Sequence, residues 1–398
     1  MKILTKKFQI IGLILFVIIF LTSPAKSLDK FNKPERFSDY FSGIILLNEN
    51  QYEGSLKYFE KLSGLESKHI NYSVKYLYSL VNSGKFKEAF NYSKRLEKKN
   101  LDIFESDLIS GIFHIKNSNM DLAKKYFDEA RKKKSRLSLN NYVSNSLFNW
   151  SNLSNLDQAT IELKKLDERF ENLKKIQNVF LNCYFGSSDI DELFTEITSN
   201  SKTDFSRYNY FHASYLASIG EISNAKEIVD NALKLNPRNL LLNQYKIDLN
   251  HNKNILVFDC KKPEHVIAEI LYINANALSS NSIYPLSNFY LNLSKYLNDD
   301  FNSYDTLLAE NFYKIENFKK AKKIYKNLSK NGEAFNWHSS KQIAKISIKN
   351  DNKDAALNLL KKTYRNLINK EVYETFDYAE FLKNNEKFKE SIPLYSEI

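Results

Sequence analysis

The sequence predicts an all-α fold in which helical hairpins stack on one another. Gly and Pro are scarce, with 9 and 6 among 398 residues, about a third of the ordinary share of about 12%. Because sandwiches, barrels and dinucleotide-binding sheets need these residues at many turns, the composition argues against β-rich folds. Apolar residues make up 43% of the chain and aromatic residues 14%, which excludes general disorder. Long helices joined by short polar turns remain.

The N-terminus has the pattern of a secretory signal peptide over residues 1–27. Three lysines precede an unbroken apolar run at 10–21, and the small-x-small triplet at 25–27 follows it. As a helix this run spans about 18 Å, less than the roughly 30 Å hydrocarbon core of a bilayer. We therefore expect cleavage after Ser27 and a periplasmic protein. The alternative is an uncleaved helix that holds the protein at the periplasmic side of the inner membrane.

The chain is basic, with 58 Lys and Arg against 47 Asp and Glu and a formal net charge of +11. Removal of residues 1–27 takes away four lysines and no acid, which leaves 54 against 47, or +7. Lys, Asn, Ile, Tyr, Phe and Ser are enriched throughout, so we favour overall composition over an acidic partner as the cause of this excess. Nucleic acid is not expected as a partner, and membrane contact is expected only through an uncleaved N-terminal segment.

Internal repeats of 34–36 residues give the main evidence for the fold. A small or apolar residue begins each repeat, and a second follows twelve positions later. The pairs are Gly43 and Ser55, Leu77 and Ala89, Gly111 and Ala123, Leu147 and Ala159, Ala309 and Ala321, Ala344 and Ala356, and Ala379 and Ser391. This spacing is typical of helical hairpins, each of which covers its apolar stripe only by stacking on the next.

Short polar turns separate the two helical periods of each repeat. They are predicted at residues 48–51, 82–85, 117–119, 218–221, 316–317, 350–352 and 384–386. Small residues at the leading positions predict a close approach of the paired helices. Large residues such as Phe59, Phe127, Tyr325 and Tyr395 are expected to fill the space against the next hairpin.

With these features the chain resembles the tetratricopeptide repeat (TPR) family, in an exported bacterial form. The family's small, closing-alanine and terminal-proline positions are occupied by Ala213, Gly220, Ala225, Ala232 and Pro237, and a second unit matches at Phe312, Ala321 and Tyr325. The resemblance implies a right-handed α-solenoid of about ten helix-turn-helix hairpins over residues 36–398. It also implies a scaffold that binds proteins or peptides.

Two stretches interrupt the rhythm of the repeats. Residues 167–205 have the length of one unit but match the pattern poorly, so we interpret them as a degenerate unit. Residues 250–263 contain a strand-like apolar run at 255–258. We expect them to form an irregular joint between an N-terminal array over 28–249 and a C-terminal array over 264–398.

The two cysteines, Cys183 and Cys260, are 77 positions apart. In a rod-like array such residues are usually about two units apart, which is beyond the reach of a disulfide unless the chain folds back. Export would permit a disulfide chemically, but two buried free thiols are the preferred interpretation.

Motifs for catalysis and metal binding are not found. The chain has no phosphate loop, no His-Glu-x-x-His motif and no histidine pair at helical ligand spacing. No cofactor, metal or enzymatic activity is therefore expected. The basic run at 131–136 could bind an anionic head group, but we favour its interpretation as the cationic C-terminus of a helix.

The resemblance implies that the first helix of each unit lines an inner groove that holds a partner peptide or helix. Carried onto the best-registered units, it places partner contacts at Arg207, Tyr210, Ser214, Thr306, Glu310, Tyr313, His338, Lys341, Lys345, Phe376, Glu380 and Lys383. Lys341 and Lys345 lie one helical turn apart, so the C-terminal groove is predicted to prefer acidic segments or a free carboxylate. Simple solvation of these lysines is an equally good interpretation.

The function predicted from these features is a non-enzymatic scaffold of the bacterial cell envelope that binds protein or peptide partners. The alternative is a TPR assembly factor held in the inner membrane by its uncleaved N-terminal helix.

Overall fold

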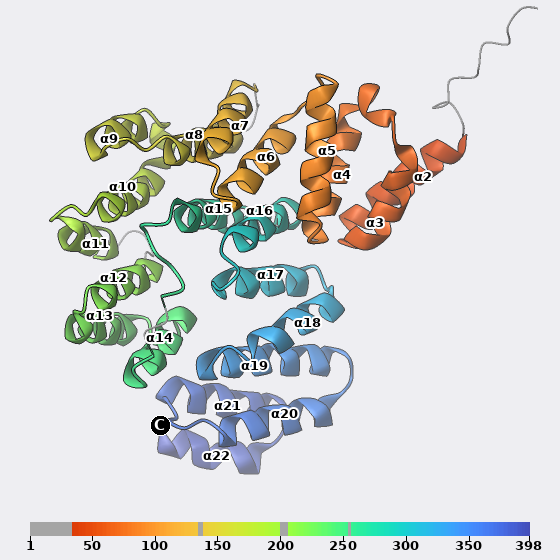
Figure 1. The fold of residues 1–398 in the computed structure, drawn as a ribbon. Coiled ribbons are helices and arrows are strands. Elements are labelled where there is room, and N and C mark those ends of the chain that lie inside the picture. Colours follow the sequence, from red (N-terminus) through yellow and green to blue (C-terminus); the bar gives the residue numbers. More distant parts are fainter. Residues whose placement is uncertain (1–33, 134–137, 200–205, 254–255) are drawn as a thin grey trace, which may run out of the picture. The chain divides into compact units, whose positions relative to one another are not determined.

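A computed structural model describes residues 34–133, 138–199, 206–253 and 256–398 (Figure 1). The predicted signal peptide at 1–27 lies outside the described residues. The chain divides into two compact units, Met1–Ser79 and Leu80–Ile398. In the first unit, α2 (Pro34–Asn48) and α3 (Tyr52–Phe59) form a hairpin, followed by two 3-10 turns, Glu60–Leu62 and Leu65–Ser67, and by most of α4 (Ile70–Asn82).

The second unit continues the same helix-turn-helix pattern. After α4 its helices are α5 (Phe86–Lys98), α6 (Phe104–Lys116), α7 (Met120–Lys132), α8 (Ser138–Ser151), α9 (Leu156–Lys164), the 3-10 turn Glu168–Phe170, α10 (Glu171–Phe185), α11 (Ile190–Thr198), α12 (Arg207–Ser218), α13 (Ile222–Leu235), α14 (Leu240–Asn250), α15 (Pro263–Ser280), α16 (Tyr284–Leu297), α17 (Ser303–Lys314), α18 (Phe318–Leu328), α19 (Glu333–Lys349), α20 (Lys353–Arg365), α21 (Val372–Asn384) and α22 (Phe388–Glu397). With α14 unpaired, the described residues hold ten hairpins and no strand. The predicted all-α solenoid of about ten hairpins is confirmed.

Nine of the ten turns within the described hairpins share one backbone geometry, and the turn between α8 and α9 is the exception. Each of the nine contains a left-handed residue, and the next residue donates its N–H to a carbonyl five positions earlier, as in a Schellman motif. In the turn between α4 and α5, for example, Gly84 has φ +74°, and the Lys85 N–H donates to the Leu80 carbonyl at 2.9 Å. The same pairing occurs in all seven turns that the sequence predicts. These turns are therefore confirmed in position.

In two of the hairpins, close packing places a glycine opposite an aromatic ring. Gly43 on α2 lies under the ring of Phe59 on α3, and a Cβ added to Gly43 would lie 2.5 Å from the ring. Gly111 on α6 lies under Phe127 on α7 in the same manner. Both rings are fully buried. Small residues at the leading positions therefore bring the paired helices together, as predicted.

The stretch interpreted as degenerate contains a regular hairpin. Residues 167–199 form a 3-10 turn followed by α10 and α11, and Phe180 and Phe194 are buried in its core. Among the described residues of the expected joint, 256–259 have no regular secondary structure. The division into arrays at 250–263 stays a prediction.

Helices that are distant in sequence pack together within Leu80–Ile398. Figure 1 shows α15 beside α8 and α16 beside α6, and α14 packs on α19. The rings of Phe86 and Tyr296 stack at 4.3 Å, and Lys116 donates to the Leu297 carbonyl at 3.2 Å. Contacts are therefore not confined to neighbouring hairpins, contrary to the expectation for a rod-like array.

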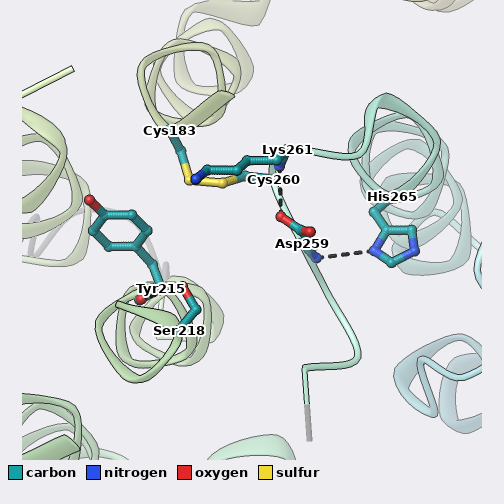
Figure 2. The surroundings of a disulfide bond; sticks show 7 residues. All are labelled: Cys183, Tyr215, Ser218, Asp259, Cys260, Lys261 and His265. Carbon is teal, nitrogen blue, oxygen red and sulfur yellow. Dashed lines mark hydrogen bonds between the residues drawn. A yellow bond between two sulfur atoms is a disulfide. The ribbon is translucent and has the colours of Figure 1, made fainter. Parts of the chain in front are cut away.

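The expectation of two free thiols is wrong, because Cys183 and Cys260 form a disulfide (Figure 2). Their Cα atoms lie 6.0 Å apart, Cys183 in the last turn of α10 and Cys260 before α15. The fold-back of α15 onto α8 brings the two cysteines together. The segment before α15 is held further by the Asp259 N–H, which donates to His265 Nδ1 at 3.0 Å.

Candidate functional site

The predicted groove residues on α12 have little exposed surface. Tyr210 and Ser214 are each 2% exposed. The ring of Tyr210 packs against Tyr245 on α14 at 5.0 Å and against Phe301 at 5.8 Å. Other helices therefore cover the face of α12 that the family resemblance assigns to a partner.

Arg207 on α12 forms a buried ion pair with Glu269 on α15. Its Nε and Nη2 donate to the two carboxylate oxygens of Glu269, both at 2.8 Å, and Glu269 is fully buried. The guanidinium also lies over the ring of Tyr272 at 4.0 Å. Burial by itself would lower the pKa of Arg207, but the facing carboxylate raises it above its ordinary value. The Arg207 guanidinium is therefore charged, and the carboxylate of Glu269 balances its charge within the fold.

A first cavity of about 440 Å³ lies beside this ion pair. Its walls come from α10, α12, α14, α15, α17 and α19 and are mainly apolar and aromatic. Arg207, Thr306 and Glu310, three of the predicted groove residues, line it. Arg207 and Glu310 are its only charged lining residues among those that the structure describes.

A second cavity of about 500 Å³ is bounded by α17, α19, α20, α21 and Arg238. The predicted residues Tyr313, Lys341, Lys345 and Glu380 line it. In all, four cations face it against two carboxylates.

Asp377 organises the charges of this second cavity. Its carboxylate accepts from Arg238 Nη1 at 2.6 Å and from Lys341 Nζ at 2.5 Å. Lys345 has no ion pair or hydrogen bond of its side chain with any residue that the structure describes. Burial and the charge of Lys341 lower the pKa of Lys345, and Asp377 offsets only part of this effect. Lys345 is therefore the cation of this cavity that lacks a counter-ion.

The remaining predicted residues lie around the second cavity without lining it. Burial lowers the pKa of His338 to about 4, with contributions from Lys341 and Lys345, so its imidazole is neutral. Phe376 is 40% exposed and lies 6.1 Å from the ring of Tyr395. Lys383 forms an ion pair with Glu380 on the same helix.

The sequence analysis did not predict two charged residues near these cavities, Glu269 and Asp377, although the sequence pattern around Glu269 indicates its burial. Glu269 is a single acid within the apolar run at 266–271, a position that implies burial with a charged partner. Asp377 gave no such signal, because its partner Arg238 is 139 positions away.

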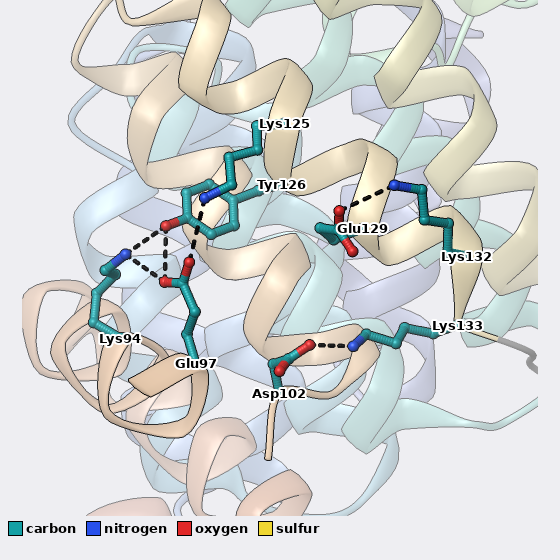
Figure 3. A network of polar contacts seen from close by, with 8 residues as sticks. All are labelled: Lys94, Glu97, Asp102, Lys125, Tyr126, Glu129, Lys132 and Lys133. Atoms are coloured by element: carbon teal, nitrogen blue, oxygen red, sulfur yellow. Dashed lines mark hydrogen bonds and ion pairs between the residues drawn. The ribbon is translucent and has the colours of Figure 1, made fainter. Parts of the chain in front are cut away.

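The basic run at 131–136 is mostly paired with neighbouring acids where it is described. Figure 3 shows Lys133 bound to Asp102 and Lys132 bound to Glu129. Arg131 donates to Asp128 at 2.6 Å. Because these cations are already neutralised, the contacts favour the interpretation of the run as a helix C-terminus. Residues 134–136 lie outside the described part.

The same region contains a cluster around Glu97, which accepts from the hydroxyl of Tyr126 at 3.0 Å and pairs with Lys94 and Lys125 (Figure 3).

No group of three or more His, Cys, Asp or Glu side chains with metal-ligand geometry occurs among the described residues. Likewise, none of the helices described is long and apolar enough to span a bilayer.

Comparison with known proteins gives matches only among solved structures. No family model and no curated protein matches the chain. The TPR domain of P58(IPK) is 15% identical over 91% of this chain and 92% of that chain, with a TM-score of 0.26. Yeast Tom70 is 14% identical over 89% and 96%, with a TM-score of 0.27. A human IFIT1 dimer with PPP-AAAA is 14% identical over 89% and 88%, with a TM-score of 0.25.

At such low identities and TM-scores, the likeness to these structures carries no argument. The TPR-like character of the chain rests on its own hairpins, its Schellman turns and its repeat period.

Proposed function

We propose that this chain is a non-enzymatic scaffold of the bacterial cell envelope that binds an acidic segment of a protein or peptide partner. The binding site is the second cavity, between α17, α19 and α21. The observation that carries the proposal is Lys345, an ammonium group without a counter-ion at the wall of a cavity of about 500 Å³.

The chemistry of the second cavity suits a carboxylate. Asp377 already shares its charge between Arg238 and Lys341, so an anion that enters would meet the positive charge of Lys345 and part of that of Lys341. Charge-assisted hydrogen bonds of this kind are stronger than neutral ones. The aromatic walls, Tyr313 and Phe381, offer apolar surface for neighbouring side chains of the partner.

Charge reversal at Lys345 tests this proposal. The probe is a fluorescein-labelled octapeptide rich in Asp and Glu, with its Asn and Gln counterpart as the uncharged reference, and binding is followed by fluorescence anisotropy. We expect Lys345→Glu to weaken binding of the acidic peptide by about tenfold or more. The control is Lys323→Glu, which makes the same change at an exposed position of α18 outside the cavity. Equal binding by the protein and by Lys345→Glu would refute the proposal.

The location in the envelope rests on two observations. Residues 1–27 have a signal-peptide pattern, and the Cys183–Cys260 disulfide suits an oxidising compartment such as the periplasm. N-terminal sequencing of the protein from its host tests this location. A mature start at Leu28 supports a free periplasmic scaffold. An intact Met1 together with recovery in the membrane fraction supports the second candidate, a scaffold anchored in the inner membrane by the apolar run at 10–21.

A further inference from the structure

The first cavity has one charge that the fold does not neutralise. Of its two charged lining residues, Arg207 is held by Glu269 through two hydrogen bonds of 2.8 Å. Glu310, on α17, has no ion pair or hydrogen bond of its side chain with any other described residue. The cavity of about 440 Å³ therefore contains a single carboxylate among mainly apolar and aromatic walls.

In the unliganded protein, the environment of Glu310 disfavours the ionised form of its carboxylate. Burial raises the pKa of Glu310, and Lys314 one turn further along α17 offsets only part of this effect. Tyr272 and Tyr325 are close enough for the charge of Glu310 to raise their pKa values as well. Glu310 is half-buried. Partial loss of water around a charge without a partner destabilises a fold, so a cation that enters the cavity would remove an existing penalty.

Three elements of the fold contribute residues to both cavities. In the chain between α13 and α14, Asn239 lines the first cavity and Arg238 the second. On α17, Glu310 lines the first and Tyr313, one turn later, the second. On α19, Phe335 lines the first cavity and Lys341 the second. A single extended segment could therefore place one side chain in each cavity.

We propose that the first cavity binds a basic side chain, Lys or Arg, of the same partner segment whose carboxylate lies at Lys345. Glu310 forms the ion pair, and the ring of Tyr272 with the apolar walls covers the aliphatic stem of the basic residue. This inference rests on the proposed function, and it adds that the partner carries a basic residue at a fixed spacing from its acidic residue. The opposite charges of the two cavities also fix the direction of the segment.

Peptide selection on the full-length protein tests this inference. A random dodecapeptide library displayed on phage is selected against the protein, and the selected peptides are synthesised with a fluorescent label. Each is compared with a version in which its Lys or Arg is replaced by Gln. We expect this replacement to weaken binding to the protein by at least about tenfold. Against Glu310→Gln the same replacement should have less than about a twofold effect, since the counter-ion is gone.

Glu227→Gln is the matched control, because Glu227 is exposed on α13 and lines neither cavity. It should retain the full loss caused by the peptide replacement. In the absence of peptide at pH 7, Glu310→Gln should also melt at a higher temperature than the unchanged protein, because the variant removes a half-buried charge without a partner. A carboxylate with a structural role would give the opposite shift.

The outcomes separate this inference from the proposed function. If selected peptides bind through their acidic residues and Lys345, but neutralising their basic residues changes nothing, the inference is refuted and the proposed function stands. The inference is also refuted if the loss is equally large against Glu310→Gln. If Lys345→Glu leaves the binding of all selected peptides unchanged, the proposed function fails, and the inference fails with it.

Discussion

At the scale of single residues, the charges that matter are those that the fold leaves without a full partner. Asp107 on α6 is one of them. Its side chain is 5% exposed, Lys133 Nζ lies 3.7 Å from Oδ2, and this oxygen has no hydrogen bond. Burial raises the pKa of Asp107 to about 7, because Lys133 offsets only part of the cost and Asp102, Glu129 and Glu97 add repulsion.

We predict that Asp107 lowers the stability of the protein as the pH rises from about 4 to about 7. The folded state binds a proton that the unfolded state has already released in this range, so the free energy of unfolding falls with increasing pH. Asp107→Asn should remove this part of the pH dependence and raise the melting temperature at pH 8 but not at pH 3.5. Thermal denaturation followed by circular dichroism measures both values.

The control for this prediction is Asp121→Asn, which neutralises an exposed carboxyl in the first turn of α7. It should leave the pH dependence unchanged. A carbon NMR titration of the Asp107 carboxyl provides a direct check, and a midpoint near 4 would contradict the prediction.

At the scale of helices and turns, the sequence predicted most of the structure because the signals are local. The seven turns lie where polar residues interrupt the apolar period, and each needs only one left-handed residue and one carbonyl five positions earlier. Residues 167–199 were interpreted as degenerate, although Phe180 and Phe194 fill the usual core positions. In that stretch the apolar residues keep the helical period but not the small-residue pattern of the repeats.

We predict that Gly111→Ala destabilises the hairpin of α6 and α7. In a helix this change ordinarily stabilises by about 1 kcal/mol, but the new methyl group would overlap the buried ring of Phe127. Overpacking of a core costs about 1–3 kcal/mol, so we expect a net loss of roughly 1 kcal/mol. Urea denaturation followed by circular dichroism measures it.

Two variants test the cause of this loss. Gly111→Ala combined with Phe127→Leu should lose less stability than the sum of the two single changes, because the smaller side chain makes room for the methyl group. Gly54→Ala makes the same change on α3, where the nearest atom lies 3.4 Å from the added Cβ. It should stabilise. A gain in stability for Gly111→Ala would contradict the prediction.

At the scale of the whole molecule, the sequence could not predict which distant helices of Leu80–Ile398 meet. The contacts that shape the two cavities join residues 62 and 139 positions apart, namely Arg207 with Glu269 and Arg238 with Asp377. No repeat pattern encodes such pairs, because they depend on how the turns accumulate over many hairpins. The expectation of free cysteines was wrong for the same reason. Among the predicted groove residues, Tyr210 and Ser214 are buried whereas Glu310 and Lys345 line cavities. Their contacts with a partner stay predictions.

We predict that the Cys183–Cys260 disulfide contributes about 4 kcal/mol to the free energy of unfolding. The bond closes a loop between residues 77 positions apart, and cross-links over such long loops remove much of the entropy of the unfolded chain. Urea denaturation with and without dithiothreitol measures the contribution. The variant Cys183→Ser with Cys260→Ser should unfold at the lower urea concentration in both conditions. An unchanged midpoint after verified reduction would contradict the prediction.

The packing of α15 on α8 and of α16 on α6 also limits how this protein can evolve. Arrays whose units touch only their neighbours can gain or lose whole units while the remaining interfaces stay intact. Here the insertion of one hairpin between α12 and α15 would displace Cys260 from Cys183 and Glu269 from Arg207 together. These long-range contacts therefore constrain the number of hairpins in this stretch. Related proteins with a different number of hairpins there should also have lost the cysteine pair.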